Sequence, residues 1–151
     1  AARAPAPSLQ VVDLAALAAA FARLVTPLAR KQGCAIVLVA DEPASVRADA
    51  ARVEQIPFNL VFNAVQAGAR EVHLGVASDP IPSISVRDDG PGLPESVRAR
   101  LFEPFFTTKP EGQGTGLGLA ISQRLAREMG AELVCDKPGP GCVFALRFPL
   151  T

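Results

Sequence analysis

The stretch Asp88-Asp89-Gly90-Pro91-Gly92 ends a β-like run, and about twenty residues later a second glycine-rich stretch follows, Gly112-Gln113-Gly114-Thr115-Gly116-Leu117-Gly118-Leu119. Glycine permits positive φ and lets a ligand approach the backbone, and a glycine turn that opens a helix directs free N–H groups at an anion such as phosphate. The second stretch opens a helical pattern that ends at Gly130, because apolar residues recur every four positions at Leu117, Ile121, Leu125 and Met129. The two turns therefore predict a nucleotide site closed by a loop, with phosphate at the start of the helix.

Composition narrows the class of protein. The chain has 151 residues, of which 49% are apolar, and this suffices for one domain with a full core. Its formal net charge is zero, so no basic excess points to nucleic acid and no charge block points to a membrane surface. The longest apolar stretch, 14–22, is far shorter than the roughly 20 residues of a membrane span. We expect a soluble domain.

The termini and cysteines indicate domain limits and compartment. Residues 1–8 are rich in Ala and Pro without periodicity and are interpreted as a linker, so the domain is expected over 9–151. Cys34, Cys135 and Cys142 are odd in number and lack C-x-x-C spacing, which favours buried, reduced thiols in the cytoplasm. The parent protein could still be membrane-anchored.

Periodicity predicts mixed α and β elements. A helix is expected from the cap Asp13 towards Gly33, bent at Pro27, and a second over about 50–67 after the cap Asp49. The first would bury the stripe Leu14, Leu17, Phe21, Leu24 and Leu28. Strands are expected over 35–40, 71–77, 81–88, 131–136 and 142–148. Because strict βαβ alternation is missing, this pattern predicts a two-layer α/β sandwich, one mixed sheet with helices on one face.

The second helix separates an apolar face from an amide face. The apolar face comprises Val53, Ile56, Leu60, Ala64 and Ala67, and the amide face comprises Asn59, Asn63 and Gln66. The amides could simply be solvated. However, each asparagine in a helix interior costs up to about 0.7 kcal/mol relative to alanine, so the pair calls for a reason. An Asn carbonyl oxygen together with phosphate oxygens is adequate coordination for Mg²⁺.

Four motifs in order resemble those of sensor histidine kinases across essentially residues 9–150. They are the N box (59–64), the first glycine box (88–92), the F box (101–109) and the second glycine box (114–119). The resemblance implies the Bergerat fold, in which three helices back a mixed sheet, ATP lies between helices, and a flexible lid spans roughly 92–114. Gyrase-type and mismatch-repair ATPases and heat-shock chaperones share this fold.

The resemblance also implies roles for individual residues. Asp88 would accept a hydrogen bond from the adenine amine and select adenine over guanine; Asp89 fits a turn role better. Asn63 would ligate Mg²⁺, with Asn59 near the phosphates and Lys109 at the γ-phosphate as a point charge. Lys109 could equally face water. The remaining nucleotide-binding positions would be Gln66, Gly90, Gly92, Thr108, Gly114, Thr115, Gly116, Leu117 and Gly118.

The expected reaction depends on Asn59. Hydrolytic relatives carry at this position a glutamate that acts as general base and takes a proton from the attacking water. The amide of an asparagine cannot take that proton. We therefore expect the γ-phosphate to pass to a histidine on a separate helical dimerisation domain, and a response regulator to act downstream. The only histidine, His73, falls in a predicted strand outside any acceptor motif. The isolated domain is expected to be monomeric and its parent homodimeric.

Two alternatives and one irregularity remain at this point. The alternatives are a gyrase-like ATPase module and a domain that docks without catalysis. The irregularity is Pro57, which lacks the N–H that would bond Val53 and costs roughly 3 kcal/mol unless the helix kinks.

Overall fold

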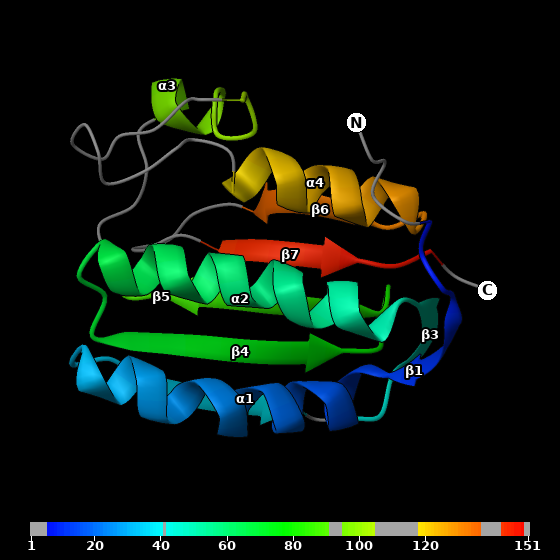
Figure 1. Ribbon diagram of the computed structural model, residues 1–151, viewed down its shortest axis with the longest axis horizontal. Coiled ribbons are helices and arrows are strands. Elements are labelled where there is room, and N and C mark those ends of the chain that lie inside the picture. Colours follow the sequence, from blue (N-terminus) through cyan, green and yellow to red (C-terminus); the bar gives the residue numbers. More distant parts are fainter. Residues whose placement is uncertain (1–5, 41, 91–94, 105–117, 137–142, 150–151) are drawn as a thin grey trace.

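The structure is a computed structural model that describes residues 6–40, 42–90, 95–104, 118–136 and 143–149. Its centre is a five-stranded mixed sheet in the order β2-β4-β5-β7-β6 (Figure 1). The strands are β2 (Ala35–Ala40), β4 (Glu71–Ala77), β5 (Ser83–Asp88), β6 (Glu132–Asp136) and β7 (Val143–Arg147). β2 pairs parallel to β4, and the other neighbours are antiparallel.

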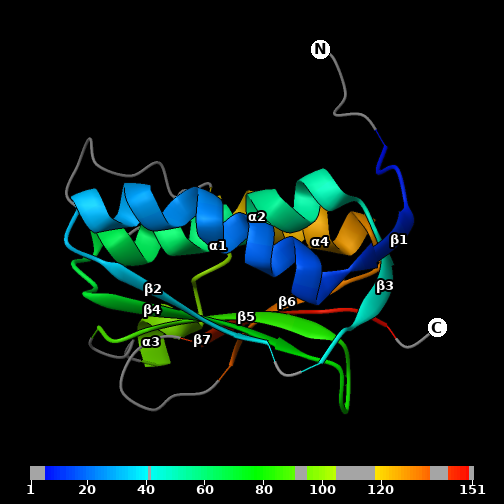
Figure 2. The ribbon, with the colours of Figure 1, turned by 90° about the horizontal axis from the view of Figure 1, so that it is seen from below.

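Three helices form the second layer on one face of this sheet, as predicted (Figure 2). They are α1 (Leu14–Lys31), α2 (Ala50–Gln66) and α4 (Gly118–Glu128). The caps expected from the sequence are confirmed: the carboxylates of Asp13 and Asp49 accept hydrogen bonds from the N–H groups of Ala15 and Ala51, at 3.0 and 3.1 Å. These bonds satisfy N–H groups that have no partner within the helix.

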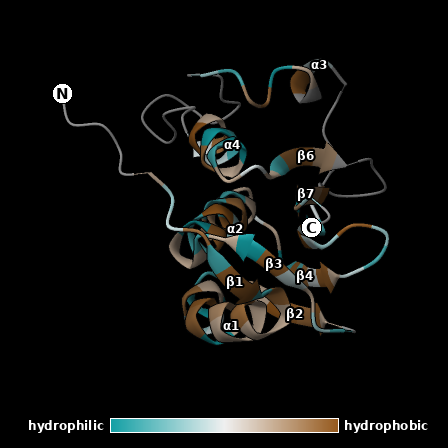
Figure 3. Cartoon of the chain, turned by 90° about the vertical axis from the view of Figure 1, so that its right-hand side faces the viewer, coloured by the Kyte–Doolittle hydropathy of each residue, from teal (hydrophilic) through white to brown (hydrophobic). Residues whose placement is uncertain are grey.

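Two short strands and a short helix were missed by the sequence patterns. β1 (Gln10–Asp13) pairs antiparallel with β3 (Ser45–Ala48), and together they form a small sheet beside the N-terminal ends of α1 and α2 (Figure 3). No strand is predicted around 45–48 from the sequence, but the alternate residues Val46 and Ala48 of this segment are buried. α3 (Glu95–Arg98) is a single turn.

The helices bury smaller residues than the periodic stripes predicted. In α1 the inward face comprises Leu14, Ala18, Phe21, Val25 and Ala29. The expected core positions Leu24 and Leu28 are instead 62% and 47% exposed. Two adjacent stripes of α1, one rich in leucine and one rich in alanine, both have the spacing of a helix face that packs on a core. The prediction chose the stripe with the larger side chains, and the structure buries the other.

Pro57 lies within α2, which runs unbroken from Ala50 to Gln66. Its side chain is less than 2% exposed and lines a small void with Phe21 of α1 and Leu74 of β4. Burial of the ring against these apolar groups offsets the missing hydrogen bond to Val53. The N-box helix therefore continues through the proline and positions Asn59 and Asn63 on successive turns.

Candidate functional site

Three elements that carry the predicted site reach the same end of the molecule. β5 ends there with Asp88, α2 ends there with Gln66, and α4 begins there with Gly118 (Figure 1). β5 reaches this end because it runs antiparallel to β4, and α4 because it runs antiparallel to α2. The first glycine box, the N box and the helix of the second glycine box are thus neighbours in the fold.

Two side-chain contacts set the register between α2 and α4. The buried Arg52 guanidinium lies 2.6 Å from the Glu128 carboxylate, and the Asn59 amide Nδ2 donates to the Ser122 hydroxyl at 3.0 Å. Seven residues along α2 (52 to 59) therefore correspond to six residues in the opposite direction along α4 (128 to 122). One further turn in each helix sets Asn63 opposite Gly118, the first residue of α4.

This register gives the N box its chemical environment. Asn59 and Asn63 are half-buried, whereas Gln66 is exposed in the last turn of α2. The first backbone N–H groups of a helix have no partner within it and favour an anion. The half-buried amide of Asn63 and the first residue of α4 therefore lie on facing turns of two adjacent helices.

Asp88 and Asp89 accept different hydrogen bonds, and it is Asp88, not Asp89 as the sequence suggested, that accepts the hydrogen bond within the turn. Oδ1 of Asp88 accepts a hydrogen bond from the Gly90 N–H at 2.8 Å, and no described group donates to its Oδ2. A Cβ at position 90 would lie only 3.0 Å from this Oδ1, so glycine permits the tight turn. Oδ2 of Asp88 is thus an acceptor without a donor among the described residues.

Asp89 instead links the end of β5 to the start of β4 through hydrogen bonds. Its Oδ1 accepts from the N–H groups of Arg70 and Glu71, at 2.9 and 3.2 Å, at the start of β4. These bonds lower the pKa of the Asp89 carboxyl, and the bond from the Glu71 N–H has the largest effect. The carboxylate is occupied by backbone donors and is structural.

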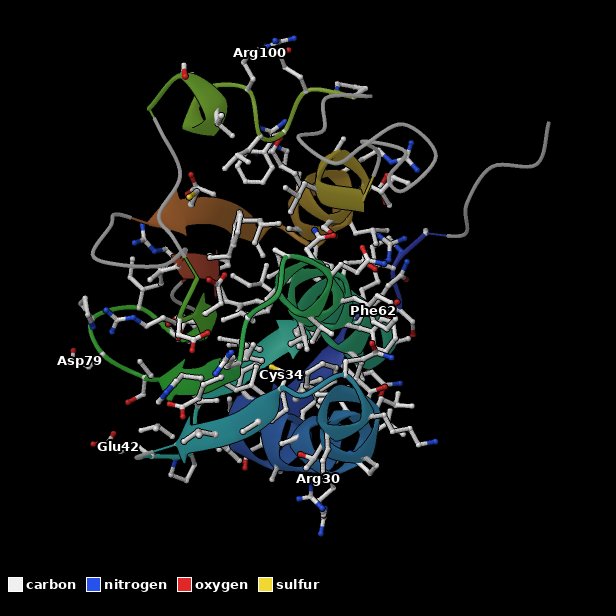
Figure 4. All side chains as sticks on the ribbon, turned by 90° about the vertical axis from the view of Figure 1, so that its left-hand side faces the viewer. Arg30, Cys34, Glu42, Phe62, Asp79 and Arg100 are labelled. Atoms are coloured by element: carbon white, nitrogen blue, oxygen red, sulfur yellow. The ribbon has the colours of Figure 1, made fainter. Side chains whose placement is uncertain are left out.

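Negative charge gathers at the Asp88 end of the sheet. Figure 4 views the molecule from this side and labels Cys34, which is 2% exposed. Burial raises the pKa of the Cys34 thiol, and the nearby carboxylates of Asp89, Asp88 and Glu71 raise it further. Cys34 matches the expectation of a buried thiol, whereas Cys135 is only half-buried.

The other predicted site residues lie outside the described residues. They are Gly92, Thr108, Lys109, Gly114, Thr115, Gly116 and Leu117. Cys142 also lies outside them. Within the F box, the ring of Phe102 packs edge-on against Phe144 of β7, with centroids 6.4 Å apart.

Ser122 was missed by the sequence reasoning. The predicted stripe of this helix included Ile121, which is 37% exposed; the buried face instead runs through Ser122, Leu125, Ala126 and Met129. A serine with 0% exposure needs a hydrogen-bond partner, and Asn59 supplies it. A second helical stripe at i, i+3, i+4 and i+7 containing one hydroxyl was the available signal.

Two further features of the described residues bear on the site. They contain no group of three or more His, Cys, Asp or Glu side chains arranged to hold a metal ion. None of the helices in this part of the chain has the length and hydropathy needed to cross a bilayer.

Comparisons with known proteins agree with this geometry. The family model described as histidine kinase-, DNA gyrase B- and HSP90-like ATPase matches residues 48–151. The two-component sensor PprA of Pseudomonas aeruginosa is 41% identical over 115 residues, which cover 70% of this chain and 12% of PprA. The histidine kinase AtoS of Escherichia coli is 37% identical, over 73% of this chain and 19% of AtoS. The chain thus corresponds to less than a fifth of these relatives.

Solved structures show the same fold. Full-length ShkA in complex with AMPPNP superposes with a TM-score of 0.82 at 34% identity, covering 98% of this chain and 32% of ShkA. The catalytic domain of histidine kinase ThkA gives 0.81 at 29% identity, covering 94% of this chain and 95% of that domain. The predicted two-layer sandwich with a mixed sheet is confirmed. The chain belongs to the histidine kinase-, DNA gyrase B- and HSP90-like ATPase family and is an ATP-binding domain of the sensor histidine kinase type.

Proposed function

We propose that this domain binds Mg²⁺–ATP between α2 and α4 and transfers the γ-phosphate to a histidine on a helical dimerisation domain of its parent kinase. The observation that carries the proposal is the register of the two helices, which sets Asn63 opposite Gly118 at the end where Asp88 lies. An acceptor for the base, an oxygen ligand for the metal and a helix N-terminus for the phosphates thereby lie at one end of the molecule.

The roles of the individual residues follow from their chemistry. The Oδ2 atom of Asp88 would accept the adenine amine, with Gly90 and Gly92 allowing the base to approach the backbone. Asn63 would hold Mg²⁺, which would neutralise charge on the transferring phosphoryl group. The phosphates would lie against the backbone of Gly114, Thr115, Gly116, Leu117 and Gly118, and Gln66, Thr108 and Lys109 would border them.

Asn59 supports transfer rather than hydrolysis. Its amide donates to Ser122, and an amide has no basic lone pair with which to activate water. A bound nucleotide therefore waits for an acceptor brought by another domain. The domain alone is expected to be monomeric and to act within a homodimeric parent.

A response regulator would be the next protein in the sequence of transfers. Support comes from ThkA, whose structure in complex with the response regulator TrrA superposes on this chain with a TM-score of 0.78 at 27% identity. That complex covers 95% of this chain and 42% of the ThkA chain.

The test is phosphotransfer with radiolabelled ATP. Supplied with the helical domain of its own parent kinase, this domain should produce an acid-labile, base-stable phosphohistidine on that partner. Without the partner, phosphate release should stay far below an ordinary enzyme rate of about 1 s⁻¹. His73 should remain unlabelled, because it lies within β4 between β2 and β5 and pairs with Glu71. Labelling of His73, or fast release without acceptor, would overturn the proposal.

A further inference from the structure

Ser122 is one of only two polar residues that are buried among the residues the structure describes; the other is Arg52. A hydroxyl without a hydrogen bond is costly to bury, so its contact at 3.0 Å with Nδ2 of Asn59 is needed for α4 to pack against α2. The contact joins the helix after the second glycine box to the N box. It lies one turn from Asn63 in α2 and one turn from Gly118 in α4.

In the structure this bond engages one branch of the Asn59 amide, its donor Nδ2. The side-chain amide is planar, with the donor Nδ2 and the acceptor Oδ1 on opposite branches. With Nδ2 bonded to Ser122, Oδ1 is the branch that remains, and it forms no hydrogen bond with the described residues. Without Ser122 the amide could rotate by half a turn and present its N–H groups instead.

We infer that Ser122 is a positioning residue that holds Asn59 with its carbonyl oxygen directed towards the phosphate and Mg²⁺ end of the site. The inference rests on the proposed function for the identity of that ligand. In this arrangement Oδ1 would be an acceptor for a donor at that end, such as water on a bound Mg²⁺, whereas the rotated amide would present a donor there. Ser122 itself touches neither the nucleotide nor the metal.

The alternative is that Ser122 only fills space between two helices. Ala126 offers a matched control, since it is 0% exposed on the same face of α4, one turn further on. Ala126→Gly weakens α4 and its packing without touching Asn59. Ser122→Ala removes one oxygen and keeps the methylene.

The experiment compares Ser122→Ala, Ala126→Gly and the unaltered domain by calorimetry with ADP without metal and with AMPPNP plus Mg²⁺. We expect Ser122→Ala to lower the affinity for Mg²⁺–AMPPNP about fivefold, the typical effect of one hydrogen bond, and to leave metal-free ADP binding within about twofold. Ala126→Gly should lower Tm but preserve both affinities. Equal losses for the two ligands in Ser122→Ala, or no loss for either, would overturn the inference.

A second measurement tests the coupling to Asn59. In an Asn59→Ala background, Ser122→Ala should cause no further loss of Mg²⁺–AMPPNP affinity, whereas independent roles would make the losses multiply. Neither measurement depends on phosphotransfer. If the unaltered domain binds Mg²⁺–AMPPNP but phosphorylates no histidine partner, the proposed kinase function fails while Ser122 is still judged by these affinities. If added Mg²⁺ does not strengthen AMPPNP binding to the unaltered domain, the inference is overturned.

Discussion

Replacement of Asp88 by asparagine tests the adenine site with little disturbance of the fold. An Asn at position 88 retains an Oδ1 that can accept the Gly90 N–H at 2.8 Å, so the turn is kept. The second branch changes from the acceptor Oδ2 to an NH₂ donor. Two donors, the new amide and the adenine amine, would then face each other.

The expected loss follows from that mismatch. Losing a hydrogen bond and leaving a donor unsatisfied costs about 1–3 kcal/mol. With about 2 kcal/mol as the central value, ADP affinity should fall roughly 30-fold, since 1.4 kcal/mol corresponds to a factor of ten. Because guanine presents an acceptor where adenine presents its amine, GDP affinity should not fall in parallel, and the preference for ADP should narrow.

Isothermal calorimetry with ADP and GDP measures both effects, and Asp89→Asn is the matched control. The donors to Asp89 among the described residues are the backbone N–H groups of Arg70 and Glu71, so its replacement should alter stability without changing the ratio of the two affinities. If Asp88→Asn bound ADP as tightly as the unaltered domain, or if that domain bound ADP and GDP equally, Asp88 would not read the base.

Three further results are expected. Asn63→Ala should abolish phosphotransfer and the Mg²⁺ dependence of ATP binding, because no carboxylate on that face of α2 can replace its oxygen; normal transfer by this variant would refute the metal assignment. Asp49→Ala should lower the free energy of unfolding by about 1 kcal/mol at pH 7, as measured by urea denaturation, because the helix loses its N-cap. Hydrogen bonds from the Ser8 N–H and other backbone groups lower the pKa of Asp49 in the folded state, so its contribution is present above the unfolded pKa of about 3.9 and is lost as the pH falls through the folded pKa. The variant and the unaltered domain should therefore converge in acid, and a constant difference down to pH 2 would contradict this. Maleimide labelling followed by mass mapping should modify Cys135 before Cys34, because Cys34 is 2% exposed and burial raises its pKa; faster labelling of Cys34 would show that the sheet opens readily at this end.

Much of the fold was predictable because its signals are local. The strands at 35–40 and 71–77 match β2 and β4 to the residue, since short apolar runs bounded by turn residues define them. The helix over 50–67 ends at Gln66, and the Asp13 and Asp49 caps were visible as single residues. The β1 and β3 strands were not predictable in this way, because each is four residues long and pairs with a segment distant in the sequence.

The candidate site, like the fold, was predictable from the sequence only in part. The sequence alone provides the motifs and the glycine-rich start of α4, and the resemblance of these motifs to those of sensor histidine kinases predicts Asp88 as an acceptor and Asn63 as an oxygen ligand. Only the tertiary structure shows which oxygen of Asp88 accepts the Gly90 N–H, that Asp89 accepts hydrogen bonds at the start of β4, and that Asn59 donates to Ser122. Asn59 and Ser122 are 63 residues apart, and their contact depends on the register of two antiparallel helices. Periodicity along one helix records which face is buried but not which residue of another helix it meets, because that pairing is selected by packing of the whole core.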